Sequence, residues 1–181
     1  MSPLPLWILA ASGAGSAEAY ELIESSILTS SASSITFSSI PQDYKHLQLR
    51  AVTRQDGAVV YGNALLSLNG TSPSYWHYLY TYNTSIYSGG YGSPYGNYGF
   101  WATGNNAATG VFAPTVMDIL DYSSSSKNTT LKYLTGYNDS NSGVALMSNL
   151  WSNTTAVTSL TIAGTSNYVA GSRFSLYGIR G

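Results

Sequence analysis

The segment spanning residues 33–54 constrains the fold more than any other part of this chain. Ile35 and Phe37 alternate with polar residues, which is the two-residue period of a half-buried strand. Pro41 then fixes its own φ and begins a turn. A second alternation follows, with Leu47, Leu49 and Ala51 on one face and His46, Gln48 and Arg50 on the other. A strand with one wholly apolar face must be covered by a second layer, so this segment predicts a sheet packed in a sandwich.

Short apolar or alternating segments, separated by turn residues, make up most of the remaining chain. We expect further strands at residues 20–28, 63–68, 74–83, 100–102, 111–122, 129–138, 143–152, 156–163 and 172–180. The segments between them are rich in Gly, Asn, Ser and Asp, which favour turns. About ten short strands without a convincing helix predict an all-β fold, an antiparallel sandwich or barrel, that forms one domain over residues 20–181.

Residues 1–19 differ from the rest of the chain and are interpreted as an extended N-terminal arm, apolar at first and then rich in Gly, Ala and Ser. The arm residues that we expect at an interface are Leu4, Leu6, Trp7, Ile8 and Leu9. Their run is too short for a membrane span, which needs about 20 apolar residues. A secretory signal peptide would fit the run and the small residues, but no Lys or Arg precedes it. We expect the arm to dock on a partner subunit; packing on its own domain and a targeting segment are the alternatives.

Charge and cysteine content narrow the classes of function. Only 8% of the 181 residues are charged, against about 25% in a typical soluble domain, and the net charge is −1. A near-neutral chain offers little to nucleic-acid phosphates, so no nucleic-acid partner is expected. The absence of cysteine excludes disulfides, thiolate zinc sites and cysteine nucleophiles. A surface rich in Tyr, Ser, Thr and Asn suggests flat polar contacts with protein or sugar.

The acidic and histidine residues form no recognisable catalytic or metal-binding motif. Asp118 and Asp121 are three residues apart in an expected strand, so their side chains should point to opposite faces, whereas two-carboxylate catalysis needs facing groups. His46 and His77 fall in separate strands and are too few to bind a metal. No nucleophile elbow, phosphate-binding loop or zinc motif is present. We therefore expect a protein that is not an enzyme, with no cofactor and no bound metal.

Tyrosine is the most distinctive residue type, with 16 in the chain and eight of them between residues 75 and 98. Those in the expected strand 74–83 should be mainly structural. Residues 85–99 are so rich in glycine that we expect a loop, and long loops usually carry function. Its tyrosines form a second candidate interface: Tyr87, Tyr91, Tyr95 and Tyr98. We expect a neighbouring subunit to cover them; the alternative is that they stay open and bind glycan.

Several sequence motifs match those of a known protein family. The first is Tyr20-Glu-Leu-Ile together with Ile35-Thr-Phe-Ser-Ser-Ile-Pro-Gln-Asp-Tyr-Lys-His-Leu-Gln-Leu-Arg. The others are Met117-Asp-Ile-Leu-Asp-Tyr, Lys132, residues 143–151 with their late Leu-Trp, and the ending Phe174-Ser-Leu-Tyr-Gly-Ile-Arg-Gly. With these motifs, residues 20–181 resemble a widespread group of tailed-bacteriophage virion proteins. The resemblance implies a β-sandwich, often jelly-roll-like, mounted on the particle as a capsid decoration or a tail appendage.

From this resemblance we expect a non-enzymatic structural protein of a tailed-phage virion, located at the surface of the phage particle. The apolar arm favours a capsid decoration or cement protein that anchors on the particle and stabilises it. Its partners would be other virion proteins, either the major capsid protein or tail proteins, and we expect a symmetric homo-oligomer such as a trimer. The alternative is a tail appendage or fibre-type binding module that contacts host glycan.

Overall fold

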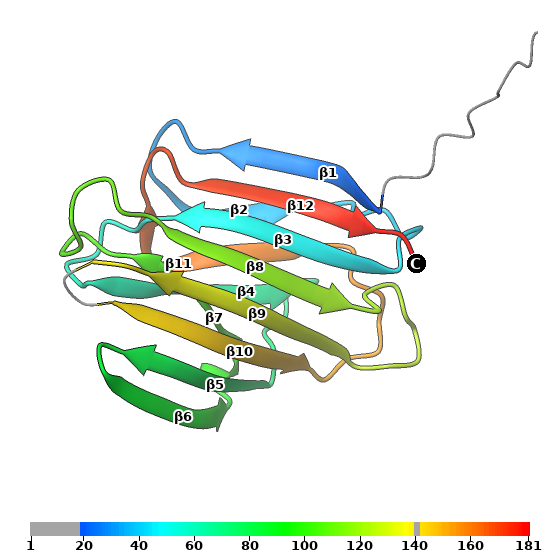
Figure 1. The fold of residues 1–181 in the computed structure, drawn as a ribbon. Helices are drawn as coiled ribbons and strands as arrows, with labels where there is room; N and C mark the ends of the chain where they lie inside the picture. The colour runs from blue at the N-terminus through cyan, green and yellow to red at the C-terminus, as the bar shows by residue number, and fades with distance from the viewer. Residues whose placement is uncertain (1–18, 140–141) are drawn as a thin grey trace, which may run out of the picture.

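Two antiparallel sheets of unequal width pack face to face in this protein (Figure 1). The computed structural model describes residues 19–139 and 142–181. The larger sheet contains, in spatial order, β1 (Tyr20–Ile27), β12 (Arg173–Ile179), β3 (His46–Thr53), β8 (Ala113–Leu120), β9 (Thr129–Tyr137), β10 (Gly143–Trp151), β5 (Tyr75–Tyr82) and β6 (Ser85–Gly92). The smaller sheet contains β2 (Ala32–Phe37), β11 (Leu160–Tyr168), β4 (Tyr61–Leu68) and β7 (Tyr98–Thr103), and a short 3₁₀ helix, η1 (Tyr95–Asn97), precedes β7. The predicted antiparallel β-sandwich is therefore confirmed.

The predicted N-terminal arm is not part of this description. Its candidate interface residues, Leu4, Leu6, Trp7, Ile8 and Leu9, all lie outside the described residues.

The alternation in β3 determines which face of the larger sheet turns inward. Leu47 and Leu49 are fully buried, as predicted. Leu49 is paired with Leu176 of β12 on one side and with Met117 of β8 on the other, and both are buried. The smaller sheet supplies the opposite wall of the core with Phe37, Leu66, Leu68, Leu160 and Ile162. One core therefore lies between the two sheets, and it includes residues from both ends of the described chain.

The prediction of a loop at residues 85–99 is wrong, because residues 85–92 form strand β6. This strand pairs along its whole length with β5. Its glycines fit because bulky side chains of β5 cover them: a Cβ on Gly89 would lie 2.6 Å from the Tyr78 hydroxyl, and one on Gly90 would lie 2.7 Å from the His77 ring. Such aromatic cover can stabilise glycine in a strand. The remainder of the segment is η1 and the start of β7, so little of it is irregular.

Two smaller differences also concern strand bounds. The described residues contain twelve strands rather than about ten. Strand β11, which lies between β2 and β4 in the smaller sheet, covers residues 160–168. The sequence had predicted a loop from residue 164 to residue 171. Its pairing with β2 shifts between Ala163 and Tyr168, and this irregularity explains why the sequence pattern breaks there.

Truncation of a buried leucine in β3 tests the register of the central strand. We expect Leu47→Ala to lower the free energy of unfolding by about 2–5 kcal/mol, because it leaves a cavity between the sheets. Val52→Ala is the matched control, because Val52 belongs to the same strand but points away from the core. We expect it to lower the free energy of unfolding by less than about 1 kcal/mol. Urea unfolding monitored by circular dichroism measures both, and equal losses would contradict this register.

Candidate functional site

A continuous cluster of aromatic side chains occupies the end of the sandwich formed by β5 and β6. Ring-to-ring contacts connect the following residues, which we call the aromatic cluster: Tyr61, Trp76, Tyr78, Tyr80, Tyr82, Tyr87, Tyr91, Tyr95, Tyr98, Trp101 and Tyr137. It includes all four tyrosines predicted from residues 85–99. β5 and β6 lie at one edge of the larger sheet (Figure 1). The 3₁₀ helix η1 packs against both strands.

Strand pairing places the rings of β6 directly against those of β5. Tyr87 is paired with Tyr80, and their rings stack with centroids 5.0 Å apart and planes at 23°. Tyr91 is paired with Trp76, with centroids 6.0 Å apart and planes at 18°. Since β6 is an edge strand, no further strand covers these tyrosines, and Tyr91 remains 50% exposed. Alternation in β5 turns Tyr75 to the opposite face of the sheet.

A buried asparagine holds the backbone beneath this cluster. The side-chain amide of Asn149 in β10 donates to the carbonyl of Gly96 at 2.7 Å and to that of Tyr98 at 2.9 Å. Its oxygen accepts a hydrogen bond of 2.9 Å from the Tyr133 hydroxyl. Burial raises the pKa of Tyr133, which keeps this hydroxyl protonated as a donor. η1 and the first residue of β7 are thus fixed to the larger sheet by side-chain hydrogen bonds.

Two adjoining hollows lie within the cluster. One, of about 350 Å³, is lined by Tyr91, Tyr95 and Tyr98. The other, of about 170 Å³, is lined by Tyr61, Asn63, Trp76, Tyr78, Tyr80, Tyr91, Tyr98 and Trp101. Together they form what we call the aromatic groove, and none of the described residues that line it carries a charge. A hydrogen bond to Tyr91, together with burial, raises the pKa of Tyr78, so the hydroxyl is uncharged at neutral pH.

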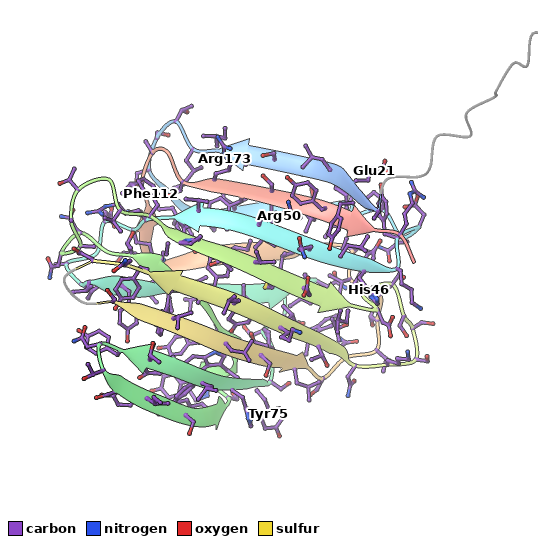
Figure 2. All side chains as sticks on the ribbon, in the orientation of Figure 1. Glu21, His46, Arg50, Tyr75, Phe112 and Arg173 are labelled. Atoms are coloured by element: carbon purple, nitrogen blue, oxygen red, sulfur yellow. The ribbon has the colours of Figure 1, made fainter. Side chains whose placement is uncertain are left out.

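The outer face of the larger sheet carries most of the large apolar side chains that the described residues expose. We call this surface the outer face, and these side chains are Tyr20, Leu22, Ile27, Val52, Tyr75, Leu79, Ile86, Val116, Leu120, Leu134, Val144 and Leu146. A hollow of about 520 Å³ lies on it between Val116, Leu134 and Val144. Arg50 and Arg173 border this hollow (Figure 2).

The sequence analysis missed the outer face, although a signal was present. In residues 144–147 the side chains that point to either face of the sheet are all apolar, and the same is true of residues 116–117 and 119–120. Continuous apolar runs are typical of strands that are covered on both faces. The signal therefore indicated a second covered face, in addition to the one packed against the smaller sheet.

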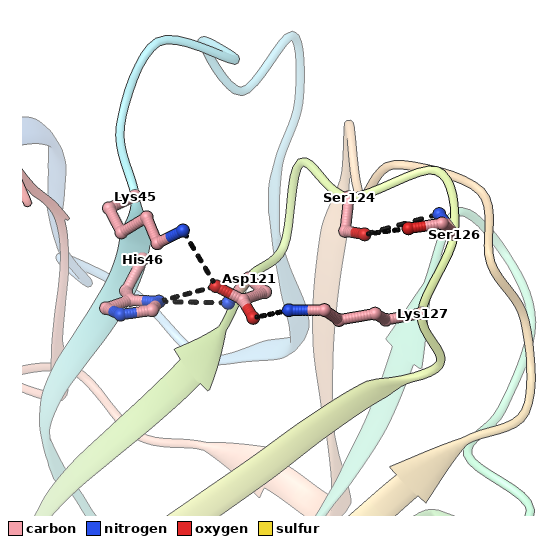
Figure 3. A network of polar contacts seen from close by, with 6 residues as sticks. All are labelled: Lys45, His46, Asp121, Ser124, Ser126 and Lys127. Atoms are coloured by element: carbon pink, nitrogen blue, oxygen red, sulfur yellow. Dashed lines mark hydrogen bonds and ion pairs between the residues drawn. The ribbon is translucent and has the colours of Figure 1, made fainter.

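The acidic residues weighed as a catalytic pair are not brought together. Asp118 lies on the outer face and accepts a hydrogen bond of 2.9 Å from the side chain of Gln48. The strand ends at Leu120, so Asp121 belongs to the following turn, with φ of 49°, and not to the strand as expected. Asp121 contacts the ammonium groups of Lys127 at 2.8 Å and Lys45 at 3.5 Å (Figure 3). These contacts give it a structural role in the turn.

The two histidines are also far from forming a common site. The backbone N–H of Asp121 donates to Nδ1 of His46 at 2.9 Å, while His77 lies on β5 opposite Gly90. Within residues 19–139 and 142–181, no three His, Cys, Asp or Glu side chains gather in a group that could hold a metal ion. The same residues include no helix of sufficient length and apolarity to cross a membrane.

Comparison of the chain with protein-family models, with curated proteins and with solved structures finds no match.

The turn carboxylate allows a test of electrostatics by pH. The hydrogen bond and charge of Lys127 lower the pKa of Asp121 below its ordinary value of 3.8. Its ionisation therefore stabilises the fold at pH values above about 4, and this stabilisation is lost as the pH falls through the lowered pKa. We expect Asp121→Asn, which tolerates the positive φ, to be less stable than the wild type at pH 7, with the difference disappearing in acid. Urea midpoints between pH 7 and pH 2 measure it; a difference independent of pH would exclude the charge pairing as its cause.

The asparagine beneath the cluster provides a second test. Asn149→Leu keeps the branched shape of the side chain but leaves the Gly96 carbonyl without its partner, whereas the Tyr133 hydroxyl and the Tyr98 carbonyl keep the 3.1 Å hydrogen bond between them. We expect a loss of about 1–3 kcal/mol in the free energy of unfolding, because that is the cost of leaving a buried polar group unpaired. Ser148→Ala, on the outward phase of the same strand, should change stability by less than about 0.5 kcal/mol. If denaturant unfolding showed equal stability for both variants, Asn149 would not be the anchor of η1.

Proposed function

We propose that this protein is a non-enzymatic structural protein of a tailed-phage virion, a capsid decoration or cement protein that attaches to the particle through the outer face. The observation that carries the proposal is the concentration of exposed apolar side chains on that face. Monomeric soluble proteins rarely expose apolar patches larger than a few hundred Å². A face of this composition is best accounted for by a partner that covers it in the assembled state.

The size of the outer face is suitable for such a partner. Eight strands about 4.8 Å apart, each about eight residues long, give dimensions of about 34 Å by about 26 Å, or about 900 Å². Each partner in a standard stable interface buries about 800 Å². The outer face therefore provides enough area for stable attachment without any other surface.

A row of polar groups on the outer face, formed by Arg50, Gln48 and Asp118, already satisfies its own hydrogen bonds. Gln48, which is only 8% exposed, donates to Asp118 and accepts a hydrogen bond of 2.9 Å from Nε of Arg50. The guanidinium of Arg50 lies over the ring of Tyr177 at 4.9 Å and that of Tyr20 at 5.3 Å. Covering a charge is costly when it loses its partners, and here the partners belong to the same face. A second protein surface could cover this row without supplying its own counter-charges.

The assignment to a phage particle depends on the sequence resemblance, and the partners proposed from it are the major capsid protein and further copies of this chain. A tail appendage is the alternative position on the particle. Copy number separates the two, because a decoration protein is present in hundreds of copies and an appendage in a handful. Quantitative mass spectrometry of purified particles measures this number.

A charge placed on the outer face tests the attachment. Leu134 is 55% exposed and lies next to the hollow, so Leu134→Lys should preserve folding while it places an ammonium group in the interface. We expect a nearly unchanged melting temperature and a loss of binding to particles that lack the protein, measured by co-sedimentation. Val59→Lys is the control, because Val59 is 45% exposed and lies outside the sheets. Equal binding of the two variants would contradict attachment through the outer face.

A further inference from the structure

We propose that the aromatic groove is a binding site for a neutral oligosaccharide. This site is separate from the outer face and adds a ligand to the structural role proposed above. The groove lies on the inner side of the β5–β6 hairpin, so a ligand there would not compete with a partner on the outer face.

The first argument concerns the rings at the sheet edge. Tyr87 and Tyr91 each stack on a ring of β5, yet 43% and 50% of their surfaces remain exposed. The backing rings of Tyr80 and Trp76 hold them in position, so little conformational entropy would be lost on binding. Fixed, exposed aromatic faces suit the C–H-rich faces of pyranose sugars, which are apolar although the sugar edges carry hydroxyls.

The second argument concerns the spacing of these rings. Tyr91 lines the groove, and Tyr87 lies beyond its hollows, stacked on the groove residue Tyr80. The two tyrosines are four residues apart on the same face of β6, which corresponds to about 13 Å along the strand. A single sugar ring cannot contact two platforms so far apart. The ring of Tyr95 lies edge-on to Tyr91, with centroids 6.0 Å apart and planes at 71°, and adds a wall beyond the second platform. The arrangement therefore suits an extended chain of sugars.

The third argument concerns the polar groups of the groove. Asn63 and Tyr78 both line it, and their amide and hydroxyl groups can donate and accept hydrogen bonds, as sugar hydroxyls do. Among the described residues, no lysine, arginine, aspartate or glutamate lines it. A charged ligand would lose its hydration without gaining a counter-charge, whereas a neutral saccharide would exchange hydroxyl–water for hydroxyl–protein hydrogen bonds.

The contrast with the outer face favours sugar over protein as the occupant. The hollow on the outer face is surrounded mainly by aliphatic side chains such as Val116, Leu134 and Val144. The described residues that line the groove contribute aromatic rings and amide or hydroxyl groups and no aliphatic side chain. Aliphatic surfaces are suited to protein partners, and alternating ring faces with neutral hydrogen-bonding groups are suited to carbohydrate.

The test uses the full chain and defined probes. Maltotriose, cellotriose and the N-acetylglucosamine trimer are titrated by isothermal calorimetry, with the galacturonic acid trimer as the charged counterpart. We expect saturable binding of at least one neutral trisaccharide, weakened about tenfold or more by Tyr91→Ala and by Asn63→Ala. Tyr75→Ala is the matched control, because Tyr75 belongs to the same hairpin, is 51% exposed and lies on the opposite face. It should bind as the wild type does, and melting temperatures verify that all variants fold.

Four outcomes would overturn the proposal. The first is no saturable binding of any neutral trisaccharide up to about 10 mM. The second is equal weakening by Tyr75→Ala and Tyr91→Ala. The third is binding by a proline-rich peptide with the sequence of residues 2–7 and not by the saccharides, since such peptides also dock in aromatic-lined grooves. The fourth is loss of self-association in Tyr91→Ala without any sugar binding, which would make the groove a subunit interface. None of these depends on attachment through the outer face, which Leu134→Lys tests separately.

Discussion

The difference in width between the two sheets is the constraint on which the rest of the structure depends. Eight strands form one layer and four form the other, so the smaller sheet covers only part of the inner face of the larger one. The central strands β3, β8 and β9 receive this cover and supply the aliphatic core. At the β5–β6 edge, η1 and the rings of the aromatic cluster fill the space instead. Aromatic side chains are large enough to do this, because each buries about 150–250 Å².

The low charge of the chain is consistent with the proposal that partner proteins cover its surface. On the outer face, Gln48 connects Arg50 to Asp118, and the guanidinium is placed against two tyrosine rings. In the turn after β8, Asp121 is paired with two lysines that come from different segments. These ionised groups thus occur in local networks, in which each charge keeps its partners when the surface is covered.

The sequence predicted the sandwich because polar and apolar residues alternate strictly in β3 from His46 to Ala51. It did not predict β6, because Ser88, Gly89 and Gly90 have no strand propensity of their own. What makes them a strand is the opposing row of rings on β5, which only the pairing reveals. The predicted tyrosines do gather at one end of the molecule. Asn63 and Trp101, which come from other segments and complete the groove, could not be found without the topology.

The β5–β6 hairpin belongs to both candidate surfaces at once, since alternate residues of a strand point to opposite faces. Tyr75, Leu79 and Ile86 extend the outer face to the edge of the sheet, while Tyr87 and Tyr91 line the inner side. If the outer face is applied to a particle, the aromatic groove lies on the other side of the same two strands and opens away from the contact. An edge strand with no charged residue and no proline, such as β6, is otherwise a site where sheets of different molecules join. Attachment of the hairpin on one side and occupation of its rings on the other would both limit access to that edge, so the two proposed functions also account for how this exposed strand is tolerated.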